Sequence, residues 1–145
     1  MQRRIVGFIA FLTILMACGK DTFQTKPTFT IESVSSNDIV PGQPLIVKLK
    51  YTDKEGDLGG GRIGVQKVVP QCALSNFTDT NKYVISDEVP ATKNQQGEIE
   101  INFPYVFINP FCNFNDTATF RFWVKDKAGN ISDTATTGTI VIRKS

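Results

Sequence analysis

Three carboxylates alternate along a glycine-rich segment near the middle of the chain: Asp53, Glu55 and Asp57. Asp126 lies in a second turn of similar composition. Carboxylate oxygens at such spacing can surround one hard cation, and Ca²⁺ takes oxygen ligands of this kind. The four side chains are therefore a candidate calcium site, although the distal Glu of an EF-hand loop is missing. The alternative is turn chemistry, in which Asp and Gly provide local hydrogen bonds and positive φ without a metal.

Trp123, the one tryptophan of the chain, follows Arg121 in a strongly alternating segment. If Phe120 and Phe122 point into the core, Trp123 lies on the opposite face beside Arg121 and Lys125. An exposed indole flanked by cations can stack on a sugar ring, so Trp123 and Arg121 are candidate binding residues. The alternatives are cation–π packing without a ligand, or a tryptophan in the core.

Histidine is absent from the sequence, which removes the commonest general base and metal ligand. Ser–His and Cys–His nucleophile pairs are excluded for the same reason. Paired carboxylates occur only in segments that read as loops. We therefore expect a chain that is not an enzyme.

The N-terminus has the layout of an export signal. Arg3 and Arg4 precede an uncharged, mostly apolar run over residues 5–17. That run is shorter than the roughly 20 residues of a membrane span, but it fits the apolar region of a secretory signal. It ends in Leu15–Cys18, LMAC, which resembles the lipobox of bacterial lipoproteins.

This resemblance implies that residues 1–17 are removed and that Cys18 carries a diacylglyceryl group and fatty acyl chains such as palmitate. Two or three such chains anchor a protein stably in a membrane. Residues 18–27 then form a tether, and Gly19 in place of an Asp favours the outer membrane. The alternatives are an ordinary cleaved signal with a chance cysteine, and an uncleaved anchor helix.

Loss of the signal changes both the charge and the cysteine count. Removing Arg3 and Arg4 from 16 basic residues leaves 14, against 14 acidic residues, and no basic stripe remains to bind nucleic acid. If Cys18 is lipidated, Cys72 and Cys112 remain as a pair. In an oxidising compartment we expect a disulfide between them, the alternative being two reduced, buried thiols.

Residues 28–145 read as one all-β domain. Short runs alternate between apolar and polar residues, turn signals separate them, and no stretch shows a sustained helical period. The pattern predicts an antiparallel sandwich of about seven strands, with a polar loop at 70–81 and a turn at Gln96-Gly97. The expected strands span 28–34, 44–52, 62–69, 82–86, 98–105, 117–125 and 139–143.

Two segments carry a family resemblance for this domain. The segment 119–132, with Val124, Asp126, Gly129 and Asn130 in a V-x-D-x-x-G-N pattern, resembles the end of bacterial immunoglobulin-like and fibronectin-type-III-like domains. The segment 51–59, YTDKEGDLG, resembles a turn that recurs in small lipoproteins. The resemblance implies an immunoglobulin-like β-sandwich, a fold that hosts many unrelated functions.

These observations predict a lipid-anchored binding or assembly module of the cell envelope, located at the outer membrane. Its expected partners are the membrane and envelope proteins. The alternative is a glycan-binding accessory lipoprotein of an outer-membrane nutrient-uptake system. Three phenylalanines around Cys112, namely Phe107, Phe111 and Phe114, either form a binding rim or cover the disulfide.

Overall fold

The computed structural model describes residues 26–145. The predicted signal at 1–17, the predicted lipidation site Cys18 and most of the predicted tether lie outside this range. No helix within residues 26–145 is long and apolar enough to cross a membrane. The elements are β1 (Thr28–Val34), β2 (Asp38–Ile39), β3 (Leu45–Asp53), β4 (Arg62–Val68), the 3-10 helix η2 (Ala73–Ser75), β5 (Phe77–Val84), β6 (Gln95–Phe103), α2 (Tyr105–Ile108), β7 (Asp116–Lys125), β8 (Ala135–Thr136) and β9 (Ile140–Ile142).

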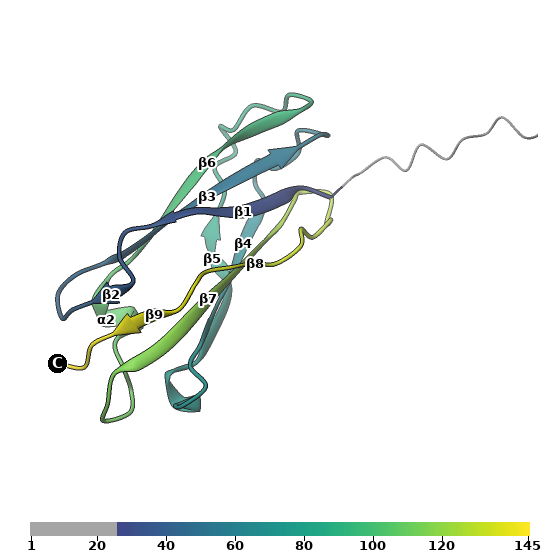
Figure 1. Cartoon of the computed structure of the whole chain (residues 1–145). Helices are drawn as coiled ribbons and strands as arrows, with labels where there is room; N and C mark the ends of the chain where they lie inside the picture. The colour runs from purple at the N-terminus through teal and green to yellow at the C-terminus, as the bar shows by residue number, and fades with distance from the viewer. Residues whose placement is uncertain (1–25) are drawn as a thin grey trace, which may run out of the picture.

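The strands form two sheets that pack face to face (Figure 1). One sheet has the order β1-β3-β6, and the other has the order β2-β9-β7-β4-β5, with β8 paired to β7. The pairing is antiparallel except between β2 and β9, which run parallel. The predicted all-β sandwich is confirmed. The sequence missed β2 and β8, two-residue strands inside segments that read as turns.

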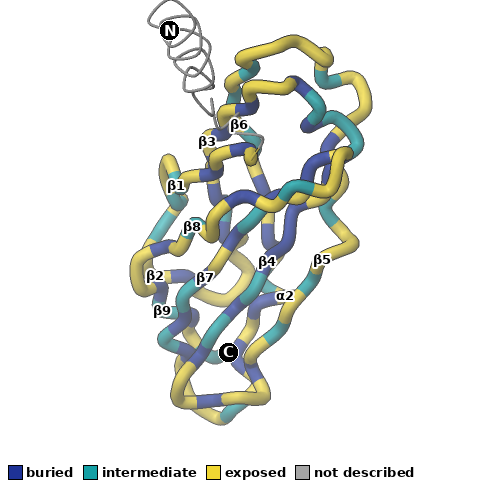
Figure 2. The backbone as a smooth tube through the Cα atoms, turned by 90° about the vertical axis from the view of Figure 1, so that its right-hand side faces the viewer, coloured by how far each residue is buried: buried dark blue, intermediate teal, exposed yellow. Residues whose placement is uncertain are grey.

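The core lies between the sheets and comes from strict alternation along the strands (Figure 2). In β7, Phe120 and Phe122 are fully buried, as predicted, while Arg121 between them is exposed. Phe103 of β6 meets both rings from the opposite sheet, at centroid distances of 5.5 Å and 6.2 Å. This aromatic contact joins the two layers, because one side chain of the first sheet packs on two of the second.

The predicted turn at Gln96-Gly97 is wrong, because both residues lie inside β6. Gly97 is paired with Tyr51 of β3, and a Cβ on Gly97 would lie 2.8 Å from the phenol oxygen of Tyr51. The glycine is therefore explained by the close approach of an aromatic ring rather than by a turn. Because the cross-strand neighbour of this glycine is not visible in the sequence, the sequence predicted a turn where the structure has a strand.

Two further boundaries differ from the prediction. β5 spans Phe77–Val84, so it begins within the predicted loop at 70–81 and ends before the end of the predicted strand at 82–86. Both predicted boundaries are wrong. β5 is an edge strand, and its polar residues face solvent while Phe77 packs edge-on against Phe120 at 6.4 Å. Tyr105 belongs to α2 rather than to a strand, because Pro104 ends β6 and precedes the helix.

The predicted disulfide between Cys72 and Cys112 is confirmed. It joins the residue before η2 to the loop after α2, with 6.2 Å between the Cα atoms and a sequence separation of 40. Cross-linking two loops at one end of the sandwich restricts the unfolded chain strongly, because the closed loop is long.

Replacing both cysteines, Cys72→Ala with Cys112→Ala, should therefore lower the free energy of unfolding by about 4 kcal/mol, the loop-closure estimate for a loop of this length. Urea denaturation of the oxidised parent and of the double variant measures the difference. Because the parent reduced with dithiothreitol keeps its side chains, it is the matched control and should show a similar loss. A loss below about 1 kcal/mol in both would contradict the estimate.

Candidate functional site

Three of the four predicted calcium ligands come together at the end of the sandwich where the described chain begins. Asp53 is the last residue of β3, and its neighbour Thr52 is paired with Thr28. Asp57 and Asp126 lie in adjoining loops, and the amide of Lys127 donates to the carbonyl oxygen of Asp57 at 3.2 Å. Glu55 lies on the exposed side of its loop. The prediction from sequence spacing therefore holds for the position of the three aspartates but not for that of Glu55.

The carboxylates of Asp53 and Asp126 bind the backbones of their own loops. Asp53 accepts hydrogen bonds from the amides of Glu55 at 3.1 Å and Asp57 at 2.9 Å. Asp126 accepts from the amide of Asn130 at 2.7 Å and from its side-chain nitrogen at 2.9 Å. Both carboxylates are buried. These bonds are the turn chemistry that the sequence offered as the alternative to a metal.

Asp57 is the third carboxylate of this group, and its hydrogen bonds, from the backbone amides of Asp57 and Ala128, leave one of its two oxygens unpartnered. Its Oδ1 atom is buried and has no hydrogen-bond partner. Burial raises the pKa of Asp57 above its ordinary value, and the negative charges of Asp126 and Asp53 raise it further. Within residues 26–145, no group of three or more metal-ligating side chains is placed to hold an ion. Calcium binding stays a prediction.

Trp123 lies on the outer face of β7, as its alternation with Phe120 and Phe122 predicted. It is paired with Gly64 of β4, and a Cβ on Gly64 would lie 2.1 Å from the indole. The ring therefore lies directly over the glycine backbone. Arg121 donates to Gln66 at 3.4 Å. A hollow of about 390 Å³ lies beside the ring and is lined by Arg62, Gly64, Thr80, Asn81, Trp123, Lys125 and Ile131.

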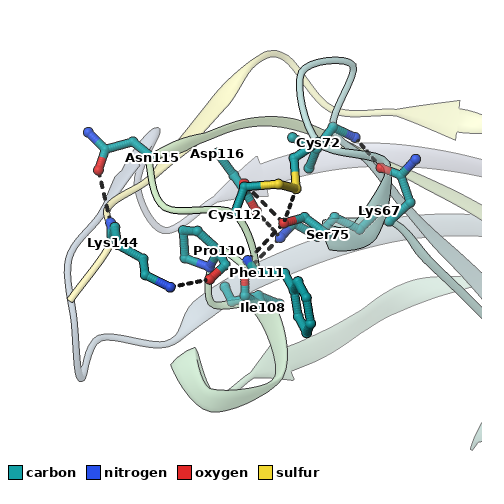
Figure 3. A network of polar contacts seen from close by, with 12 residues as sticks. Lys67, Cys72, Ser75, Ile108, Pro110, Phe111, Cys112, Asn115, Asp116 and Lys144 are labelled. Atoms are coloured by element: carbon teal, nitrogen blue, oxygen red, sulfur yellow. Dashed lines mark hydrogen bonds and ion pairs between the residues drawn. A yellow bond between two sulfur atoms is a disulfide. The ribbon is translucent and has the colours of Figure 1, made fainter.

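A buried ion pair, which the sequence did not single out, lies at the opposite end of the sandwich (Figure 3). Lys67 Nζ is 2.6 Å from Asp116 Oδ2, and the two side chains are 1% and 0% exposed. Lys67 also donates to the carbonyl oxygen of Ile108 at 2.8 Å. Burial lowers the pKa of Lys67, while the hydrogen bond to Asp116 and its charge oppose that shift.

The second oxygen of Asp116 extends this pair into a network that reaches the disulfide (Figure 3). Ser75 of η2 donates to Asp116 Oδ1 at 3.1 Å. The same hydroxyl oxygen accepts from the amide of Phe111 at 2.9 Å and lies 3.3 Å from the sulfur of Cys72. The network therefore connects β4, η2, α2 and β7 with the loop that carries Cys112.

Five exposed apolar side chains lie on η2, on α2 and on the loop between α2 and β7, and we call them the aromatic patch: Leu74, Val106, Phe107, Phe111 and Phe114. The side chains of Phe107, Phe111 and Phe114 are 59%, 70% and 46% exposed. Lys82 Nζ lies over the ring of Phe107, 4.0 Å from its centroid. Exposed apolar side chains that gather at one end of a domain are candidates for an interaction site.

The aromatic patch and the beginning of the described chain lie at opposite ends of the sandwich (Figure 1). β3 shows this directly, because its Thr52 is paired with Thr28 of β1 while its Leu45 is paired with Phe103 of β6. Phe103 immediately precedes the segment of α2 and the disulfide loop. A chain held at its N-terminal side therefore presents the patch at its far end.

Sequence reasoning missed Lys67, Asp116 and Ser75. The signal for two of them was present, since Lys67 follows Ile63 and Val65 at alternate positions and Asp116 precedes Ala118 and Phe120 in the same way. Alternation thus places both inward. Ser75 carried no comparable signal, because its role depends on how η2 packs.

No protein-family model and no curated protein matches the chain. Among solved structures, the sporulation control protein Spo0M from Bacillus subtilis is 10% identical over 83% of this chain and 50% of its own, with a TM-score of 0.46. A beta-glucosidase from Listeria innocua is 9% identical over 83% of this chain and 16% of its own (TM-score 0.48). A mutant of the SrpA adhesin from Streptococcus sanguinis is 19% identical over 83% of this chain and 56% of its own (TM-score 0.36). The chain thus spans between 16% and 56% of the length of these neighbours.

Asp57→Asn should stabilise the domain at neutral pH. The folded pKa of Asp57 lies above its unfolded value near 3.8, so this group favours folding when protonated, and that contribution is lost as the pH rises through the folded pKa. The advantage of the asparagine should therefore be present at pH 7 and vanish below pH 3.8. Thermal unfolding at both pH values, with and without millimolar Ca²⁺, measures it. A parent protein stabilised by Ca²⁺, with an Asn variant that is not, would show that Asp57 is a calcium ligand instead.

Lys67→Met should lower the free energy of unfolding by about 3–5 kcal/mol, because it leaves the charge of Asp116 buried without a partner. Lys67→Met combined with Asp116→Leu removes both charges and should be more stable than the single variant. The matched control is Lys93→Met at an exposed position between β5 and β6, which should change stability by less than about 0.5 kcal/mol. Urea denaturation gives all three values, and a single variant as stable as the control would refute the role of the pair.

Proposed function

We propose that this chain is a lipid-anchored, non-catalytic binding or assembly module of the cell envelope at the outer membrane. The observation that carries the proposal is the aromatic patch at the end of the sandwich opposite the chain start. The lipobox-like sequence at Leu15–Cys18 supports an anchor on the N-terminal side. An anchored domain of this shape holds its aromatic patch away from its own membrane, where another envelope protein can reach it.

The patch suits a protein partner because its base is rigid. The rings rise from segments joined by the disulfide and by the Lys67–Asp116 pair. Exposed aromatic side chains on a fixed backbone lose little conformational entropy on binding, and such residues commonly carry most of the energy of an interface. The cation over Phe107 adds a polar rim to the apolar centre.

Expression of the full chain in a Gram-negative host tests both parts of this proposal. The parent should partition with the outer-membrane fraction, whereas Cys18→Ala should not. After crosslinking, Phe107→Ser with Phe111→Ser should recover about tenfold less of any co-purifying envelope protein. The matched control, Val40→Ser with Ile131→Ser, removes exposed apolar side chains elsewhere and should recover the parental amount. Equal recovery by both pairs, or parental partitioning of Cys18→Ala, would contradict the proposal.

A second candidate function is glycan binding as an accessory lipoprotein of a nutrient-uptake system. The hollow beside Trp123 favours it, because an indole lies next to guanidinium, amide, hydroxyl and ammonium groups that suit sugar hydroxyls. The one tryptophan makes the test direct, since a sugar stacked on it should change its fluorescence. Titration with soluble oligosaccharides should give a saturable change in the parent and in the Phe107→Ser/Phe111→Ser variant alike. No change at millimolar sugar would remove this candidate.

A further inference from the structure

β6 is a free edge of the first sheet. It ends the order β1-β3-β6, and no strand within residues 26–145 pairs with its outer side. Its pairing with β3 runs in unbroken register from Leu45↔Phe103 to Asp53↔Gln95. A long, regular edge of this kind presents a row of backbone donors and acceptors to a further strand.

β5, the neighbouring edge of the second sheet, is different. Its register with β4 shifts between Ile63 and Val65. Within this irregular stretch, Asp79 accepts hydrogen bonds from the amides of Asn81 and Lys82, each at 2.9 Å. A bulge and a side chain that takes up backbone donors both discourage further pairing. The edge of β6 carries neither feature.

An apolar cleft of about 320 Å³ opens between these two edges. Its apolar lining comes from Ile63, Tyr83, Val84, Ile85, Val89, Ile99 and Ile101, and Lys82, Ser86 and Glu100 complete it. Ile99 and Ile101 are two of the inward-facing residues of β6. A strand added to β6 would place every second side chain on the same face as these two, and therefore over the cleft. The added strand would thus be held both by backbone hydrogen bonds to β6 and by burial of its apolar side chains in the cleft.

The other face of β6 indicates the charge of the added strand. Glu98 and Glu100 are exposed there, and in the register with β3 they stand opposite Lys50 and Lys48. Opposite charges at directly paired positions favour strand pairing, and like charges oppose it. The paired side of β6 already has Lys opposite Glu. A segment with basic residues at its outward positions would form the same Lys–Glu or Arg–Glu pairs on the free side of β6.

The same two glutamates disfavour a second copy of this chain as the occupant. Two copies of β6 can pair as antiparallel strands related by a twofold axis. In the registers of longest overlap, their apolar residues share one face when Glu98, Ile99 or Glu100 lies on that axis. Those registers place Glu98 opposite Glu100, or one of them opposite itself. Each choice opposes like charges, which is a common protection against edge-to-edge association.

We propose that β6 and the adjoining cleft bind an extended segment of another protein as an additional strand, with apolar residues at alternate positions and Lys or Arg between them. This mode of recognition derives affinity from backbone hydrogen bonds and specificity from alternate side chains. The surface is separate from the aromatic patch, and it goes beyond the function proposed above by naming the form and charge of a second partner segment.

Two labelled nine-residue peptides test this proposal on the full chain. One alternates Val with Lys, and the other carries Glu in place of every Lys. The Val/Lys peptide should bind about tenfold more tightly, and it should protect the amides of β6 from hydrogen exchange. Glu98→Lys with Glu100→Lys should reverse the preference. The matched control, Glu32→Lys with Asp133→Lys, makes the same change of charge at exposed positions away from β6 and should keep the parental preference.

Equal binding of both peptides, or protection at the aromatic patch without protection of β6, would overturn the proposal. So would a control that reverses the preference as the β6 variant does. Protection of β6 in the absence of peptide, together with a dimer in sedimentation, would identify a second copy as the occupant and also overturn it. If β6 fails while the Phe107→Ser/Phe111→Ser variant still loses its crosslinked partner, only this inference fails and the proposed function stands.

Discussion

The ion pair between Lys67 and Asp116 is the interaction on which the far end of the sandwich depends. Removing a lysine or a carboxylate from water costs several kcal/mol, so neither charge would be stable at its position alone. Each compensates the other at 2.6 Å, and their remaining hydrogen-bonding capacity goes to Ile108 and Ser75. The burial of two charges therefore fixes β4, β7, α2 and η2 relative to one another, and the disulfide closes the same region covalently.

The two ends of the domain are stabilised by different means. At the end where the described chain begins, Asp53 and Asp126 each bind the amides of their own turns, so those loops hold their shape locally. At the far end the bonds join segments that are distant in sequence, with Lys67 and Asp116 separated by 49 positions. The exposed rings of the aromatic patch thus stand on a base fixed by tertiary contacts, which favours a surface shaped in advance for a partner.

Much of this architecture could be predicted from the sequence, because alternation reports directly which side chains face the core. It gave the buried face of β7, and the odd cysteine count gave the disulfide. Lys67 shows the limit of this reasoning. Alternation predicts that Lys67 faces the core, whereas its charge predicts that it faces solvent. The two predictions can be reconciled only when its distant partner Asp116 is known. Gly97 shows the same limit, because the reason for a glycine at this position is the ring of Tyr51 in the neighbouring strand.

We infer that this buried network holds the loop of the aromatic patch rigidly on the sandwich. The amide of Phe111 reports on it most directly, because this amide lies outside the strands and donates to Ser75, which in turn donates to Asp116. Native-state hydrogen exchange, followed by NMR on the oxidised full chain, measures its opening free energy. We expect the Phe111 amide to exchange as slowly as the core amides of β7, through global unfolding. Exchange at the rate of an unprotected loop amide would contradict it.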